Sequence, residues 1–199
     1  GTTTLNSGKM ILAKGDNTNA IGGNLTIAPV FGWANSATGV ELAANEQIPD
    51  AAVISFTGVD WSGFRPKGFI ETVGGLSSPG GKGVIENAGQ GQAGVTQNGT
   101  LIVNNSTDFL YNGYIRNNDG VGATKINFTK SGSGTQTLQG ANIVYTGDTT
   151  VSAGTLKLLD TTAFANGAAA QNFAIAGSAN LEFSVSTGTQ NLGSTGGLT

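Results

Sequence analysis

Short runs of apolar and β-branched residues recur along the whole chain, and each run is bounded by Gly, Asn, Ser or Asp. The runs have the length of β-strands, and several alternate between apolar and polar residues as strands do. They lie at residues 10–12, 24–27, 52–56, 101–103, 125–128, 155–158 and 180–185. The one helix-like stretch, residues 163–170, is interrupted by Asn166-Gly167 and is too short for a stable isolated helix. The sequence therefore predicts an all-β fold.

Composition limits what such a fold can do. Hydrophobic residues make up 38% of the 199 residues and charged residues only 11%, which is the opposite of a charge-driven disordered chain. The chain has no His and no Cys, so it lacks an imidazole base, a thiol nucleophile, a disulfide and the usual ligands of zinc. A net charge of −3, without a cluster of Lys and Arg, argues against nucleic acid as a partner. No run approaches the roughly 18 apolar residues of a transmembrane helix.

An all-β chain of this length could form a sandwich, a closed barrel or a solenoid. Internal repetition in the sequence is the test that distinguishes these architectures. Residues 1–12 align with residues 147–158, so that glycines, threonines and apolar positions coincide. Self-similarity favours a β-solenoid, in which each coil buries its Leu, Ile and Val against the next. Each such side chain contributes roughly 1.5–3 kcal/mol, which offsets chain ordering only when neighbouring coils are present. We predict a single β-solenoid over residues 1–199 with a partial early copy at 1–12.

The most specific pattern in the chain covers residues 128–158. Its positions are Phe128, Lys130, Gly132, Gly134, Thr135, Leu138, Gly140, Asn142, Tyr145, Gly147, Thr149, Val151, Gly154 and Leu156. This order closely resembles the autotransporter-associated β-strand repeat, also called the passenger-associated transport repeat. One residue is extra, because Asn142-Ile143-Val144-Tyr145 stands in place of Asn-x-Tyr. The resemblance implies a right-handed parallel β-helix that is exported to the outer cell surface or the exterior of a Gram-negative-type bacterium, and it implies no particular activity.

The 12 acidic residues are scattered singly, whereas a glycosidase needs two facing carboxylates and a polysaccharide lyase needs clustered acidic ligands. We therefore predict no catalytic, cofactor-binding or metal-binding residues, and a non-enzymatic structural segment that serves as a scaffold or adhesin. Because open solenoid ends expose unpaired backbone groups, the chain is expected either to belong to a longer solenoid or to self-associate head to tail into a fibre. The alternatives are a carbohydrate-binding or polysaccharide-degrading β-helix and, third, a phage tail spike.

Aromatic and cationic residues concentrate in residues 31–69, which we interpret as an irregular, loop-rich portion of the solenoid. Residues 62–67 look inserted relative to the family pattern, and inserted loops on solenoids often carry recognition. Trp and Arg are also frequent contact anchors. The predicted partner-binding residues, with surface glycans among the candidate partners, are Trp33, Trp61, Phe64, Arg65 and Lys67. In the competing interpretation, Trp33 and Trp61 fill the core of irregular coils.

Overall fold

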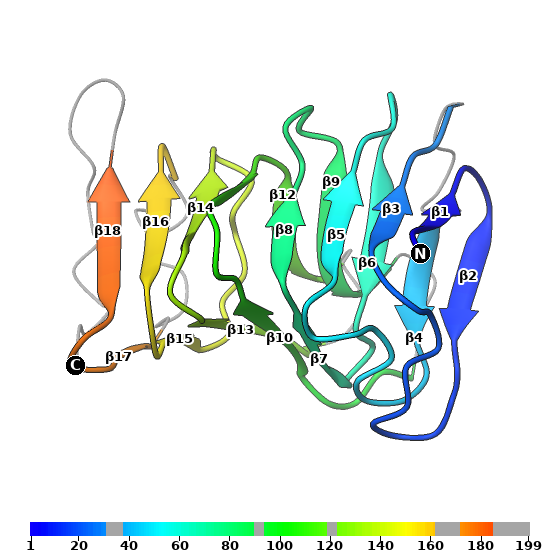
Figure 1. Cartoon of the computed structure of the whole chain (residues 1–199), viewed down its shortest axis with the longest axis horizontal. Helices are drawn as coiled ribbons and strands as arrows, with labels where there is room; N and C mark the ends of the chain where they lie inside the picture. Colours follow the sequence, from blue (N-terminus) through cyan, green and yellow to red (C-terminus); the bar gives the residue numbers. More distant parts are fainter. Residues whose placement is uncertain (31–37, 90–93, 119–122, 162–171, 185–199) are drawn as a thin grey trace.

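The computed structural model describes residues 1–30, 38–89, 94–118, 123–161 and 172–184. Within these residues the regular structure is entirely β, and every pairing between strands is parallel. The strands stand side by side along the longest axis of the molecule, with the N-terminus at one end and the last described strand at the other (Figure 1). None of the described residues form a helix long and apolar enough to cross a membrane. The predicted parallel β-solenoid is confirmed.

The strands form three faces along this axis. The first face has a strand in every coil, the second has strands only from β2 to β12, and the third only from β7 to β17. The first face contains β1 (Thr3–Leu5), β3 (Leu25–Ile27), β5 (Val53–Phe56), β8 (Gly75–Ser77), β11 (Phe109–Tyr111), β14 (Thr135–Gln139), β16 (Thr155–Leu159) and β18 (Asn180–Ser184). The second contains β2 (Lys9–Leu12), β4 (Gly39–Leu42), β6 (Ser62–Arg65), β9 (Gly83–Ala88) and β12 (Tyr114–Asn118). The third contains β7 (Ile70–Val73), β10 (Gly99–Asn104), β13 (Ile126–Ser131), β15 (Thr149–Val151) and β17 (Phe173–Ile175).

One passage of the chain around the axis, called a coil here, varies widely in length. Paired positions on the first face are 20 residues apart from Gln136 to Leu156, and 33 residues apart from Ser78 to Tyr111. The strands themselves stay three to six residues long, so the corners between faces take up the difference. The structural repeat is therefore the three-faced coil, and the loops at its corners are free to differ.

The core lies inside the three faces, where strands bury alternate side chains. In β10 the inward residues Leu101 and Val103 are fully buried, and in β13 the same holds for Ile126 and Phe128. Parallel pairing places Leu101 directly beside Phe128 in the neighbouring coil, so like side chains stack in rows along the axis. Each row buries apolar surface only because a neighbouring coil is present, which is the physical basis of solenoid cooperativity.

Asn and Asp side chains join successive coils at the corners. The Oδ1 atom of Asn24 accepts a hydrogen bond from the backbone N–H of Val53 in the next coil, at 2.9 Å. The same arrangement recurs from Asn45 to Ile70, Asn98 to Lys125, Asp108 to Thr135 and Asn127 to Asp148, at 2.8–3.1 Å. These bonds satisfy N–H groups at corners, where the ladder between strands ends. The short polar residues that bound the predicted strands thus have a specific structural role.

The portion interpreted as irregular, residues 31–69, is more regular than expected. Its described part contributes β4, β5 and β6 to the stack. The interpretation of residues 62–67 as an inserted loop is wrong, because Ser62–Arg65 forms β6, which pairs with β4 on one side and β9 on the other. Residues 163–170, the helix-like stretch, lie outside the described residues.

Residues 1–12 and 147–158 share local geometry but lie on different faces. The first segment runs from β1 to β2, from the first face to the second, whereas the other runs from β15 to β16, from the third face to the first. Both turn at a glycine with left-handed backbone, Gly8 at φ 74° and Gly154 at φ 63°. The shared sequence pattern therefore corresponds to a strand, a glycine corner and a second strand.

Candidate functional site

Two aromatic and two cationic side chains meet where the first face turns into the second. Trp61 directly precedes β6, Lys82 directly precedes β9, and Tyr114 and Arg116 lie on β12. These strands are neighbours in the sheet order β12-β9-β6, so the four residues come from three successive coils. All four side chains are half-buried. We call this group the Trp61 cluster.

The contacts within the Trp61 cluster are continuous. The Trp61 and Tyr114 rings meet edge to face, with centroids 5.1 Å apart and planes at 62°. The Lys82 ammonium lies 4.7 Å from the centre of the Trp61 ring, and the Arg116 guanidinium lies 5.7 Å from that of Tyr114. Both distances are within the range at which a cation is attracted to the negative face of an aromatic ring.

The five predicted partner-binding residues are placed differently from one another. Trp61 lies in the cluster, and half-buried Lys67 lines a groove of about 620 Å³ at the corner between the second and third faces. Phe64 and Arg65 have relative exposures of 0% and 1%, so they belong to the interior of the coil stack. Trp33 lies outside the described residues. Partner binding by these five residues stays a prediction.

Sequence reasoning missed Lys82, Tyr114 and Arg116. Trp61 and Tyr114 are 53 residues apart, and only the coil register brings them together. Lys82 could have been found only from the strand register. Ser62 pairs with Gly83 in the sheet, so the residues before them, Trp61 and Lys82, lie at equivalent positions of neighbouring coils. That register is not readable from the sequence, since coil length varies.

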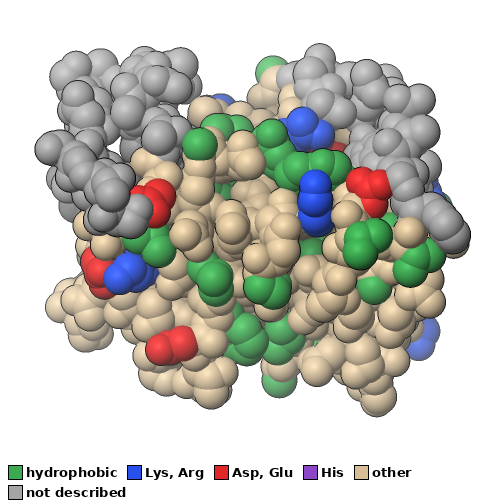
Figure 2. Space-filling view, turned by 90° about the horizontal axis from the view of Figure 1, so that it is seen from above, with side chains coloured by type: hydrophobic (Ala, Val, Ile, Leu, Met, Phe, Trp, Pro, Cys, Tyr) green, Lys and Arg blue, Asp and Glu red, His purple; other side chains and the backbone are tan. Residues whose placement is uncertain are grey.

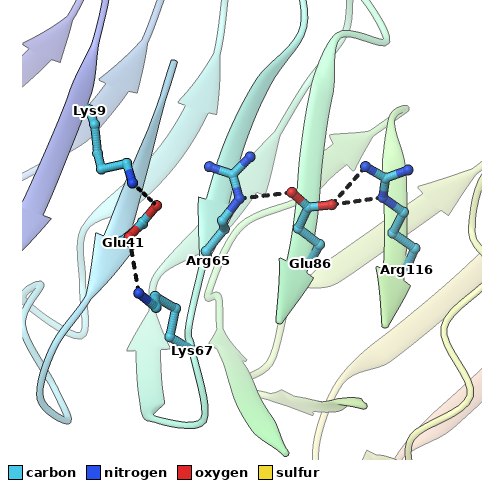
Figure 3. A network of polar contacts seen from close by, with 6 residues as sticks. All are labelled: Lys9, Glu41, Arg65, Lys67, Glu86 and Arg116. Carbon is cyan, nitrogen blue, oxygen red and sulfur yellow. Dashed lines mark hydrogen bonds and ion pairs between the residues drawn. The ribbon is translucent and has the colours of Figure 1, made fainter. Parts of the chain in front are cut away.

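A row of charged side chains crosses the second face and includes Arg116 of the Trp61 cluster (Figure 3). Glu86 on β9 accepts a bond from Arg65 on β6 at 2.8 Å and is held by Arg116 on β12 at 2.7–2.8 Å. Glu41 on β4 likewise lies between Lys9 at 3.0 Å and Lys67 at 3.2 Å. Both carboxylates are nearly inaccessible, with relative exposures of 2% for Glu41 and 0% for Glu86. Each carboxylate is engaged by two cations, so the row joins strands.

Glu71, at the start of the third face, has a buried carboxyl group with a strongly raised pKa. Its two oxygens accept hydrogen bonds from the backbone N–H groups of Gln47 and Ile48, both at 2.9 Å. Burial raises the pKa of Glu71 to about 8, against the lowering effect of these two bonds. β7 is the first strand of the third face, and the loop that follows β4 lies beside it, where the Glu46 N–H donates to the Ile70 carbonyl at 3.0 Å. The Glu71 carboxyl group therefore holds the loop between β4 and β5 against β7.

The described residues contain no group of three or more acidic side chains that could hold a metal ion. On the face that Figure 2 shows, charged side chains stand singly or in small groups among uncharged atoms. Glu86 and Glu41 are committed to ion pairs and Glu71 to backbone groups, so none of these three is oriented as an acid or base toward an open groove.

The segment of residues 128–158 makes a little more than one complete coil and stacks on itself. Phe128 on β13 pairs with Thr149 on β15, and Gln136 on β14 pairs with Leu156 on β16. The inward residues Leu138, Val151, Leu156 and Leu158 are fully buried. Buried Tyr145 shares a 2.8 Å hydrogen bond with Thr149.

Lys130 explains the polar and glycine positions of the same segment. Its fully buried side chain carries the ammonium to a corner, where Nζ donates to the carbonyl oxygens of Ser131, Gly132 and Ala153 at 2.7–3.2 Å. Burial lowers the pKa of Lys130, which Asp108 partly opposes. A Cβ atom at Gly154 would meet this ammonium at 2.9 Å and would also run into the carbonyl oxygens of Gly132 and Gly134. The corner therefore requires both a lysine and glycines.

Comparison with known proteins agrees with this geometry. The family model described as passenger-associated-transport-repeat matches residues 128–158. The curated proteins and the solved structures gave no match to the chain. The match covers the self-stacking coil of residues 128–158 and confirms the family resemblance that the sequence pattern predicted.

Proposed function

We propose that this chain is a structural segment of an autotransporter-type passenger, displayed on or released from the surface of a Gram-negative-type bacterium. The proposal rests on one observation, which is that residues at the characteristic positions of the repeat have structural roles within the coil. Lys130, Gly154 and Tyr145 are each occupied in closing or stacking the coil. A motif whose positions are used in this way specifies a coil, and its function is to extend a stiff solenoid.

A rigid scaffold of this kind acts as a spacer or adhesive surface. Its parallel coils bury a continuous core, and the corners vary in length while the faces remain in register. Self-association is the second possibility that we retain. In the described residues β1 pairs only with β3, and β18 pairs only with β16, so a further coil of the same or another chain has backbone groups to pair with.

Two measurements test the proposal. Antibodies raised against the purified chain should label intact, unpermeabilised cells of the source organism, and external protease should remove this signal. Labelling only after permeabilisation would contradict a surface role. Sedimentation of the purified chain over a range of concentrations separates the two forms of scaffold, because end-to-end association produces open-ended assemblies and a spacer sediments as one species.

A further inference from the structure

We propose that the Trp61 cluster binds an acidic glycan, a sugar chain bearing carboxylate or sulfate groups. The inference rests on the surface location proposed above and names a ligand class for that surface. Its basis is the combination of two partly exposed aromatic rings with the Lys82 ammonium, whereas Arg116 in the same cluster is already paired with Glu86.

Lys82 is the group that gives the cluster its charge preference. The Trp61 ring holds its ammonium at 4.7 Å, and no carboxylate in the described part of the chain forms an ion pair with it. Its backbone is fixed, because the Lys82 carbonyl accepts a hydrogen bond from the Ser62 N–H at 3.1 Å. A cation held on one side by a ring and half-exposed on the other is placed to pair with an anion from solvent.

The two rings supply the complementary apolar surface. The C–H groups of a pyranose ring carry small positive charges and pack against the negative faces of Trp and Tyr rings. Trp61 and Tyr114 are fixed at 62° to each other, so they present surfaces of different orientation to one ligand. A ring face beside an ammonium thus matches an apolar sugar face that carries an acidic substituent.

The size and charge of the cluster argue against other partners. It spans three neighbouring strands, which lie roughly 4.8 Å apart, so its length along the axis is about 10 Å. A stable protein interface is far larger, at about 800 Å² per partner. Two cations on a chain of net charge −3 are also too few for binding a nucleic acid through its phosphates.

The test is binding of defined sugars to the whole purified chain by calorimetry. Oligogalacturonate and dextran sulfate are the acidic probes, and fully methyl-esterified oligogalacturonate is the neutral control. We expect an acidic probe to bind, the neutral control to bind at least about tenfold more weakly, and the affinity to fall with added salt. Binding of oligogalacturonate would indicate a carboxylated ligand, and binding of dextran sulfate would indicate a sulfated one. Equal binding of the neutral control, or no binding of either acidic probe, would overturn the proposal.

Matched variants locate the binding. Lys82→Gln and Trp61→Ala should each weaken binding about tenfold or more, whereas Trp61→Phe should retain most of it. Lys157→Gln, which removes a partly exposed cation on the first face, is the control and should leave binding unchanged. An equal loss in the Lys157 variant would indicate nonspecific attraction and refute the assignment. Circular dichroism confirms that each variant is folded.

Failure of this inference is distinguishable from failure of the proposed function. If the cells are labelled at the surface but the chain binds no glycan, the proposed ligand is rejected and the proposed structural role at the surface stands. Glycan binding by a chain that cell labelling places inside the cell would reject the surface role while the binding site stands.

Discussion

Gly154 shows how a single position of the repeat is determined by its surroundings. Its backbone adopts φ 63°, which disfavours any side chain, and the space where a Cβ would lie is bordered by two carbonyl oxygens and the Lys130 ammonium. Gly8 has the same backbone conformation, at φ 74°, but open space around it. The two positions therefore separate the cost of backbone strain from the cost of crowding.

Substitution of these glycines by Ala should follow that difference. Gly8→Ala should cost about 1 kcal/mol through backbone strain alone, and Gly154→Ala about 3 kcal/mol or more because a steric clash is added. Gly80→Ala is the control, since Gly80 lacks a left-handed backbone and has open space, and should change stability by less than about 0.5 kcal/mol. Urea unfolding measures all three. Equal losses for Gly8 and Gly154 would show that the corner relaxes around a methyl group.

Glu71 should make stability depend on pH. Its pKa is 4.5 in the unfolded chain and about 8 in the folded chain, so between these values the folded chain retains a proton that the unfolded chain has lost. The contribution to stability is complete below pH 4.5 and disappears as the pH rises through about 8, with a slope of about −1.4 kcal/mol per pH unit.

Urea unfolding between pH 5 and pH 8 tests this dependence, and the absence of His removes the side chain that normally titrates there. Glu71→Gln should flatten the profile, because an amide does not titrate. If the stability of the unmodified chain did not change with pH, the raised pKa of Glu71 would be contradicted. If the pH dependence persisted in the Glu71→Gln variant, it would belong to another group.

At the scale of single elements, β9 depends on its neighbours through Glu86. Its carboxylate is fully buried between Arg65 and Arg116, and the two Nη atoms of Arg65 have no hydrogen-bond partner among the described residues. Removing the charge of Glu86 leaves a buried guanidinium without its counterion. Such a loss is costly because the desolvation of the remaining ion is no longer offset.

Glu86→Gln should therefore destabilise the fold by about 3–5 kcal/mol. Glu182→Gln is the control, because Glu182 pairs with Lys157 at 2.7 Å on the surface, and its loss should cost at most about 1 kcal/mol. Thermal unfolding of both variants at one pH measures the difference. Similar values for the two would mean that solvent reaches the buried row.

Strands were predictable and their partners were not. The runs at residues 24–27, 52–56, 101–103 and 125–128 all coincide with observed strands, except that the first residue of three of them, at 24, 52 and 125, lies just before the strand. Short alternating segments between polar residues have few other structures. Ser62–Arg65 was misinterpreted because Trp, Gly and Pro around it are typical of a loop, whereas pairing on both sides makes it a strand. The local sequence pattern predicts that a segment is a strand, whereas the neighbouring coils determine which strands it pairs with.

For the molecule as a whole, the repeat could be read from the sequence, and the candidate site could not. Residues 128–158 define one coil by local spacing alone, since their corners require particular glycines. The Trp61 cluster depends on the register of three coils of different length. Trp61 was selected for its residue type, while Lys82 and Tyr114 carry no local signal. Sites built across coils are therefore beyond single-sequence reasoning.

The direction of the hydrogen bonds between coils has a mechanical consequence. Strands stand across the long axis, so the bonds that join them run along it (Figure 1). Tension applied between the two ends loads the bonds of one coil at a time, and the solenoid should peel open in steps. Each detached coil of 20 to 33 residues would release roughly 65–120 Å of slack before the next one yields. A tether built in this way absorbs a sudden pull by lengthening, and its remaining coils stay wound.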